Sequence, residues 1–210
     1  AGVNPWHRVW VFGSAQEGEE QMALDVYRRL NEQHPELRLI LVPRHRERFD
    51  RVAQLIESSD LIPHRRSIDQ PMPHGDWTPD RVVLIDTIGE LSHWWGVGQI
   101  ATVGGSFGDR GGQNMLEPAG YGSAISFGPN TRNFADIAQR LLEADGAVRV
   151  GGADELQGFV HRCLTDVAAA DALGRAAKEV VRSHRGATAR TLEAIGGLVG
   201  HPAVHSREAA

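Results

Sequence analysis

The segment Gly104–Ala119 carries the residue types best suited to binding an anion. Five glycines fall within the nine residues from Gly104 to Gly112, directly after an apolar run that predicts a strand. Glycines let backbone N–H groups approach a ligand closely and permit positive φ angles. A predicted helix follows, and its N-terminal N–H groups and positive dipole end would point at this loop. The segment therefore predicts an anion site, although a flexible surface loop can have the same glycine content.

The same segment supplies candidate ligand contacts. We expect backbone or side-chain contacts from Gly104, Gly105, Ser106, Gly111, Gly112 and Asn114. Glu117 lies about one turn into the predicted helix, where its carboxylate can accept hydrogen bonds from a ribose diol. The segment is not a P-loop, because no Gly-Lys-Ser/Thr follows, nor is it a Gly-x-Gly-x-x-Gly dinucleotide loop after the first strand.

A second cluster, Pro43–Phe49, contains three arginines and a histidine at the end of the predicted strand Leu37–Val42. Open α/β sheets bind ligands at the carboxyl ends of their strands. Arginine can hold an oxyanion there through two parallel hydrogen bonds. We favour a ligand contact for Arg44, which is nearest the strand end. For Arg46 and Arg48 we favour a solvated helix start in which Glu47 pairs with its neighbours.

Two more loops follow predicted strands and begin with residues typical of helix caps: Ser14–Glu20 and Asp86–Leu91. Ser14 and Glu17 fit a capping box, in which each side chain satisfies a backbone N–H of the first helical turn. Ser14 would also lie at the ligand edge of the sheet. In the other loop, Thr87 or Asp86 would cap the helix and Glu90 would close the box. A ligand role for that loop competes evenly with the capping role.

Apolar runs predict the strands that position these loops: Arg8–Phe12, Leu37–Val42, Leu61–His64, Arg81–Ile85, Ile100–Val103 and Ala124–Phe127, with Ala147–Val150 as a seventh. The runs are mostly continuous rather than alternating, which is typical of strands covered on both faces. Helical patterns separate them: Gly18–Asn31, Phe49–Ile56, Gly89–Trp95, Asn114–Tyr121 and Asn133–Leu142. The spacing of Trp94-Trp95 from Leu91 predicts core packing rather than a stacking platform.

This alternation predicts a Rossmann-like α/β fold, with a parallel sheet of about six strands flanked by helices. Asp154–Leu198 predicts a helical C-terminal segment, and the proline-rich stretch Ile68–Pro79 predicts a loop. We expect one domain over residues 1–199, because domains run to roughly 100–200 residues. The polar tail Gly200–Ala210 is predicted to be disordered.

Composition excludes several classes of protein. The net charge of −5 argues against non-specific nucleic-acid binding. Cys163 is the single cysteine, so neither an internal disulfide nor a cysteine-rich zinc site is possible. The ten histidines form no metal pattern, and the carboxylates lack calcium-loop spacing, so no metal or cofactor is expected. No apolar run approaches the roughly 18 residues of a membrane span, and residues Ala1–Trp6 have neither the basic start nor the apolar stretch typical of a signal peptide.

Four loops together resemble the motif set of the 3-deoxy-D-manno-octulosonic acid (Kdo) transferase family, in the family's order: Ser14–Glu20, Pro43–Phe49, Asp86–Leu91 and Gly104–Ala119. Gly128–Phe134 resembles a fifth family segment, and Arg185–Ala187 a weaker sixth. The similarity covers most of residues 8–195. It implies the C-terminal, donor-binding half of a two-domain GT-B glycosyltransferase.

The resemblance implies a function in lipopolysaccharide biosynthesis. The family transfers Kdo from CMP-Kdo to a lipid A precursor at the cytoplasmic face of the bacterial inner membrane, without a metal ion. Its C-terminal domain holds the CMP-sugar, which would place Glu90 near the donor. Its N-terminal domain holds the acceptor and a catalytic carboxylate. Because nothing here matches that domain, we expect a soluble fragment with no catalytic residue, inactive alone, that contacts the membrane only through the full-length protein.

The chain departs from the family pattern at Gln16 and Gln113, where the family usually has histidine. Glutamine donates hydrogen bonds but carries no charge near neutral pH, so the donor contacts or the acceptor would differ. Two alternatives stay open. One is a nucleotide-sugar epimerase, which would bind UDP and need catalytic carboxylates in this region. The other is a non-catalytic nucleotide-binding or interaction domain.

Overall fold

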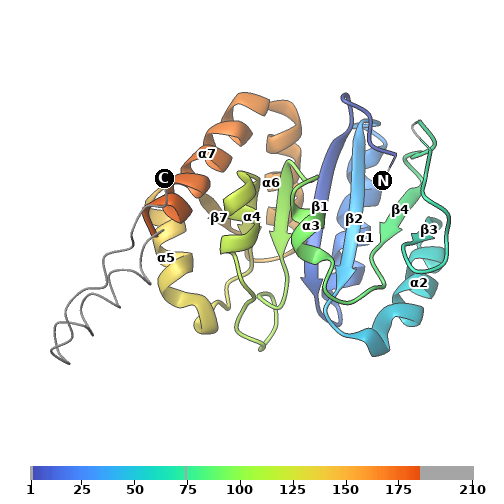
Figure 1. Cartoon of the computed structure of the whole chain (residues 1–210), viewed down its shortest axis with the longest axis horizontal. Helices are drawn as coiled ribbons and strands as arrows, with labels where there is room; N and C mark the ends of the chain where they lie inside the picture. Colours follow the sequence, from blue (N-terminus) through green and yellow to red (C-terminus); the bar gives the residue numbers. More distant parts are fainter. Residues whose placement is uncertain (1, 74, 185–210) are drawn as a thin grey trace, which may run out of the picture.

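A computed structural model describes residues 2–73 and 75–184 and is built on one parallel sheet (Figure 1). Its strands are β1 (Arg8–Ala15), β2 (Leu37–Pro43), β3 (Ile62–Arg65), β4 (Arg81–Leu84), β5 (Ile100–Val103), β6 (Ala124–Phe127) and β7 (Ala147–Arg149). They lie in the order β3-β4-β2-β1-β5-β6-β7, and every pairing is parallel. The predicted Rossmann-like sheet is confirmed, with the seventh strand included.

Helices cover both faces of this sheet: α1 (Glu19–Asn31), α2 (Phe49–Ser58), α3 (Leu91–Trp95), α4 (Leu116–Tyr121), α5 (Ala135–Glu143), α6 (Ala153–Thr165) and α7 (Val167–His184). Two short 3-10 turns, η1 (Arg46–Arg48) and η2 (Arg132–Phe134), precede α2 and α5. The side chains of β1 alternate between the two faces, as the pleat requires. Trp10 and Phe12 pack with α1, α2 and α6, whereas Val9 and Val11 pack in the core that α3, α4 and α5 cover.

Gly13, near the end of β1, determines how α3 packs on the sheet. A Cβ atom at this position would lie 2.4 Å from the indole ring of Trp95, so only glycine leaves room for the ring. Trp95 is 1% exposed and belongs to the core on this face. The predicted core role of Trp95 is therefore confirmed, and this packing fixes the position of the loop that precedes α3.

The C-terminal part is helical as far as the structure describes it. The predicted segment Asp154–Leu198 forms α6 and α7, which are separated at Asp166, up to His184. The family segment Arg185–Ala187 and the tail Gly200–Ala210 lie outside the described residues. Among the described helices, none has both the length and the apolar character needed to cross a membrane.

Candidate functional site

A cleft opens at the carboxyl edge of the sheet, where β1 has β2 on one side and β5 on the other. The chain reverses its direction of winding between these strands, which is where open α/β sheets bind ligands. A cavity of about 440 Å³ lies there, lined by Ser14, Arg44, Gly89, Leu91, Ser92, Trp95, Gln113, Asn114, Glu117 and Phe134. A cavity of about 310 Å³ adjoins it and shares several of these residues. All four predicted loops therefore contribute to one cleft.

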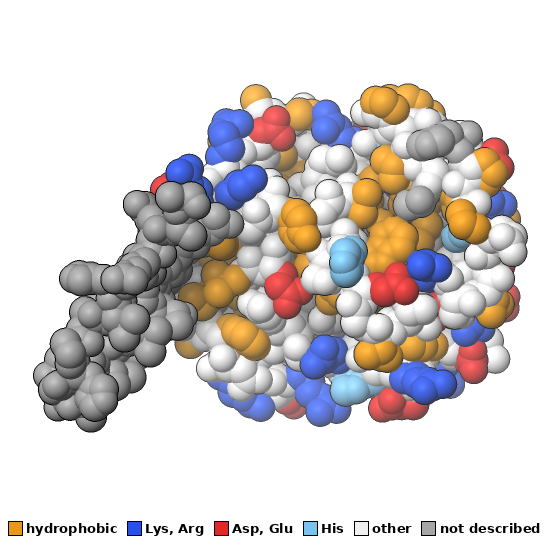
Figure 2. All heavy atoms as spheres, viewed as in Figure 1, with side chains coloured by type: hydrophobic (Ala, Val, Ile, Leu, Met, Phe, Trp, Pro, Cys, Tyr) orange, Lys and Arg blue, Asp and Glu red, His pale blue; other side chains and the backbone are white. Residues whose placement is uncertain are grey.

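Ser14, Arg44, Asn114 and Glu117 are the predicted site residues that the structure brings together. Arg44 is exposed, and its guanidinium forms no ion pair with any described residue. Figure 2 shows other Arg side chains along this edge of the molecule, the lower edge in the view, with Asp and Glu side chains among them. Arg44 thus supplies an unpaired positive charge to the cleft, although the net charge of the chain is −5.

Arg48 does not line the cleft, as expected, but it pairs with Glu20 and Glu17 rather than with Glu47 in a solvated helix start. Its guanidinium donates to the buried carboxylate of Glu20, with 2.8 Å between Nε and Oε1, and lies 3.2 Å from Glu17. These contacts raise the pKa of Arg48, and the hydrogen bond with Glu20 is the largest cause. Glu47 lies 3.9 Å from the ring of His45, as expected for a solvated helix start. Arg44 is thus the arginine of this cluster that lines the cleft.

Glu19 occupies the amide groups that the glycine loop was expected to offer to a ligand. Its carboxylate accepts the backbone N–H groups of Gly105 (2.7 Å), Ser106 (3.1 Å) and Phe107 (3.0 Å). It also accepts the N–H of Gln16 at 2.8 Å. The start of the loop therefore already holds an anion, and that anion belongs to the chain itself.

The remaining loop residues hold the cleft wall in place. The Gly104 N–H donates to the carbonyl of Gly13 at 2.8 Å, and the Gly112 N–H donates to the carbonyl of Gly105 at 2.7 Å. The buried Ser106 hydroxyl donates to the Val103 carbonyl, so it does not face the cleft. None of these loop residues lines the main cavity.

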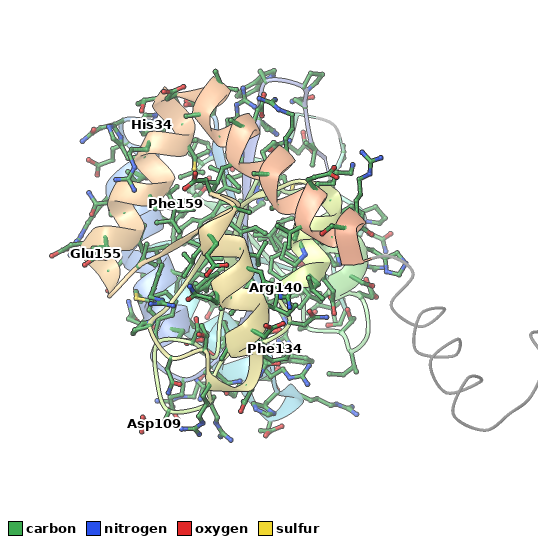
Figure 3. All side chains as sticks on the ribbon, turned by 90° about the vertical axis from the view of Figure 1, so that its left-hand side faces the viewer. His34, Asp109, Phe134, Arg140, Glu155 and Phe159 are labelled. Atoms are coloured by element: carbon green, nitrogen blue, oxygen red, sulfur yellow. The ribbon has the colours of Figure 1, made fainter. Side chains whose placement is uncertain are left out.

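The fifth family segment clamps this loop from the opposite side. Its side chains donate to three consecutive loop carbonyls: Asn130 to Gly108, Arg132 to Asp109 and Asn133 to Arg110. Gly111 has a φ of 88°, and a Cβ there would lie 2.7 Å from Arg132. Figure 3 shows Asp109 and Phe134 at the same end of the molecule. Gly128–Phe134 therefore stabilises the loop.

The far end of the loop faces the cleft. The side chain of Asn114 lies just before the short helix α4, where its Oδ1 accepts the N–H of Leu116 at 3.1 Å. Its Nδ2 donates to Glu117 at 3.2 Å, and Glu117 is exposed on the cleft wall. Within the described residues, the backbone N–H groups of Gln113 and Asn114 donate no hydrogen bond. These amides have no partner in the described chain, and both residues line the main cavity.

The two departures from the family pattern lie in different places. Gln113 lines the main cavity. Gln16 lies instead in a hollow of about 190 Å³ on the other side of the glycine loop, together with Glu19 and Asp109. Of these two residues, Gln113 is thus the one that lines the main cavity.

Both predicted capping boxes are wrong. Helix α1 begins after Gly18, whose φ of 86° makes the turn, and no side chain caps it. Ser14 is instead buried at the end of β1 with a φ of 58°, and Glu17 contacts Arg48. The local sequence pattern failed here because the exit of β1 is held by long-range contacts.

Helix α3 is also uncapped by any side chain. Asp86 accepts hydrogen bonds from the Arg65 guanidinium at 2.7 Å and from the Ser67 N–H at 2.8 Å. Glu90 lies 3.1 Å from Arg66 and lines a separate cavity of about 450 Å³ that includes Trp94. The structure therefore does not bring Glu90 into the main cavity, where Ser14, Arg44, Asn114 and Glu117 lie.

Asp86 makes the fold sensitive to acid. Burial by itself would raise the pKa of Asp86, but the hydrogen bonds from Ser67 and Arg65 outweigh burial and hold this pKa below its usual range. A carboxylate whose pKa is lowered by folding stabilises the fold at pH values above its pKa in the unfolded chain, which is near 3.8. That contribution is lost as the pH falls through the folded pKa.

Asp86→Asn should therefore lower the free energy of unfolding by about 1.5–3 kcal/mol at pH 7, the range for hydrogen bonds to charged groups. The difference from the parent chain should shrink below about pH 4. Urea unfolding followed between pH 7 and pH 3 measures both effects. Asp50→Asn is the matched control, because Asp50 also binds Arg65 but its side chain is 84% exposed. A loss that stays constant down to pH 3 would contradict this assignment.

No protein-family model matches the chain. It is 36% identical over 188 residues to 3-deoxy-D-manno-octulosonic acid transferase of Haemophilus influenzae, a match that covers 89% of this chain and 43% of that enzyme. The transferase of the same name from Bordetella pertussis is 34% identical over 192 residues, covering 89% of this chain and 44% of the enzyme. The chain thus spans less than half the length of these relatives.

The chain also matches solved structures of single C-terminal domains. The C-terminal CMP-Kdo binding domain of WaaA from Acinetobacter baumannii is 31% identical, with a TM-score of 0.78 over 84% of this chain and 90% of that domain. The C-terminal domain of the group 1 glycosyl transferase LpcC from Francisella tularensis shares the fold at 12% identity, with a TM-score of 0.57. The predicted glycosyltransferase-type C-terminal fold is therefore confirmed.

Proposed function

Because this chain belongs to the 3-deoxy-D-manno-octulosonic acid transferase family, we propose that its cleft binds CMP-Kdo as the sugar donor. The full-length protein would transfer Kdo to a lipid A precursor in lipopolysaccharide biosynthesis. That reaction would take place at the cytoplasmic face of the inner membrane. The acceptor and the catalytic base would lie in a part of the protein that this chain does not include.

The observation that carries the proposal is the set of groups around one cavity of about 440 Å³: a cation, free amides and a carboxylate. Arg44 and the N–H groups of Gln113 and Asn114 would hold the donor phosphate, because guanidinium and amide groups bind phosphate oxygens well. Glu117 would accept hydrogen bonds from the ribose hydroxyls. The cavity has the volume of an ordinary small-molecule site.

These positions define a role in the transfer step. An acceptor hydroxyl would give its proton to the catalytic base while its oxygen attacks the anomeric carbon of Kdo, and the bond from that carbon to the CMP phosphate oxygen would break. The electron pair leaves with CMP, so negative charge grows on the phosphate. Arg44 and the two free amides would stabilise that charge, and their effect is largest when they are fixed in place beforehand. Gln113 would add a neutral donor whose hydrogen bond does not depend on pH near neutrality.

Competitive titration of CMP against UDP tests the proposal. We expect CMP to bind at least about tenfold more tightly, a difference of roughly 1.4 kcal/mol. We also expect weak binding overall and no Kdo transfer by the isolated chain, because half a cleft lacks contacts and preorganisation. Tighter binding of UDP would favour the epimerase alternative, for which Glu117 is the one carboxylate among the described residues that line the cavity. Binding of neither nucleotide would favour an interaction domain.

A further inference from the structure

Glu19 is a buried carboxylate outside the cleft whose partners are all backbone amides. It is 5% exposed and does not line the main cavity. Its Oε2 accepts the N–H groups of Gln16 and Gly105, and its Oε1 accepts those of Ser106 and Phe107. No described Arg, Lys or His forms an ion pair with it. Concave groups of backbone N–H groups of this kind bind anions in many proteins.

These hydrogen bonds connect two walls of the cleft. On one side, Gln16 follows the β1 exit that carries Ser14 into the cleft. On the other side, the carbonyl of Gly105 accepts the N–H of Gly112, one residue before the free amides at Gln113 and Asn114. A change at Glu19 should therefore reach both walls through a short series of hydrogen bonds.

We propose that Glu19 is a positioning residue of the donor cleft, an inference that rests on the proposed function. Its carboxylate fills the amide cradle at Gly105–Phe107, so the donor phosphate is directed to Arg44 and to the far end of the loop. The hydrogen bonds of Glu19 also fix the position of that far end, because Gly105 is bonded to Gly112. The competing arrangement is one in which Glu19 moves away and the cradle itself receives the phosphate.

The two arrangements predict opposite effects of removing the carboxylate. Glu19→Ala leaves the cradle empty, so it should tighten CMP binding if the cradle is the phosphate site and weaken it if Glu19 positions the wall. Glu19→Gln keeps the size of the side chain but leaves only one of the two acceptor oxygens. The NH₂ group that replaces the other oxygen would face two backbone N–H donors. Glu17→Gln is the matched control, because Glu17 lies in the same loop but its side chain is 76% exposed.

Calorimetric titration should show CMP binding about tenfold weaker for Glu19→Gln and Glu19→Ala, with Glu17→Gln within about twofold of the parent. Without nucleotide, amide hydrogen exchange at Gly105, Phe107 and Gly112 should be at least about tenfold faster in Glu19→Gln than in the parent. The reason is that the free energy needed to open the hydrogen bonds of these amides is smaller in that variant. Glu19→Asp should restore part of both properties, since it keeps both oxygens on a shorter side chain.

Unchanged or tighter CMP binding by a folded Glu19→Ala would overturn the proposal, as would unchanged exchange at Gly112 in Glu19→Gln. If neither variant folds, Glu19→Asp decides, and parent-like affinity and exchange in that variant would overturn it. If the parent chain binds no CMP, the proposed function fails by itself. The exchange at Gly112 then still tests whether Glu19 holds the far end of the loop.

Discussion

Replacing Trp95 by alanine is expected to lower the free energy of unfolding by about 3–5 kcal/mol, the usual cost of removing a large buried aromatic side chain. Trp95 is 1% exposed, packs against Gly13 and also lines the cleft. Its indole N–H has no hydrogen-bond partner in the described part of the chain. The substitution therefore breaks no hydrogen bond of the indole, and chemical denaturation followed by circular dichroism is the suitable measurement.

Trp94→Ala is the matched control for this prediction. Trp94 is half-buried and lines the separate cavity, so its removal should cost clearly less, about 1–2 kcal/mol. A double mutant adds a sharper test. Gly13→Ala should destabilise the parent strongly, yet cost little in Trp95→Ala, because residues in contact give non-additive effects. Additive losses would mean that the indole is not packed on Gly13 as described.

Much of the fold could be predicted because the local signals agree with the tertiary structure. Most strands are continuous apolar runs because both faces of the sheet are covered, and each predicted run became a strand, including the partly exposed edge strand β3. The carboxyl ends of parallel strands share one edge, which is why loops as distant as those of Ser14 and Glu117 could be expected in one site. Arg44 could be selected for the same reason, since it directly follows β2.

The hydrogen bonding of the site could not be predicted, because it depends on partners far away in the sequence. Glu19 is an acidic residue in the first turn of a helix, a pattern that normally indicates only a favourable interaction with the helix dipole. Its partner Gly105 is 86 residues away. Asp86 likewise looked like a cap, but the exit of β3 brings Arg65 and Ser67 to it. Glycine content indicated an anion at the loop, although not that the chain supplies one.

The cleft should distinguish ligands that carry a phosphate from those that lack one. Arg44→Ala should weaken CMP binding by about 1.5–3 kcal/mol, roughly ten- to a hundredfold. The guanidinium of Arg44 is exposed in the cleft and has no ion-pair partner among the described residues, so it is free to hold a phosphate. Cytidine lacks that phosphate, so it should bind the parent much more weakly than CMP does. Its affinity should be the same for Arg44→Ala and the parent.

Arg46→Ala is the matched control, because Arg46 is exposed two residues further on and lines neither cavity of the cleft. This variant should bind CMP with an affinity within about twofold of the parent, since a distant exposed charge contributes little. Raising the salt concentration should weaken CMP but not cytidine, because partly exposed charge pairs are screened. Calorimetric titrations of both ligands at low and high salt measure all of these effects. If cytidine bound as tightly as CMP, the free amides and Arg44 would not be a phosphate site. The donor phosphate would then have to bind elsewhere along the carboxyl edge of the sheet.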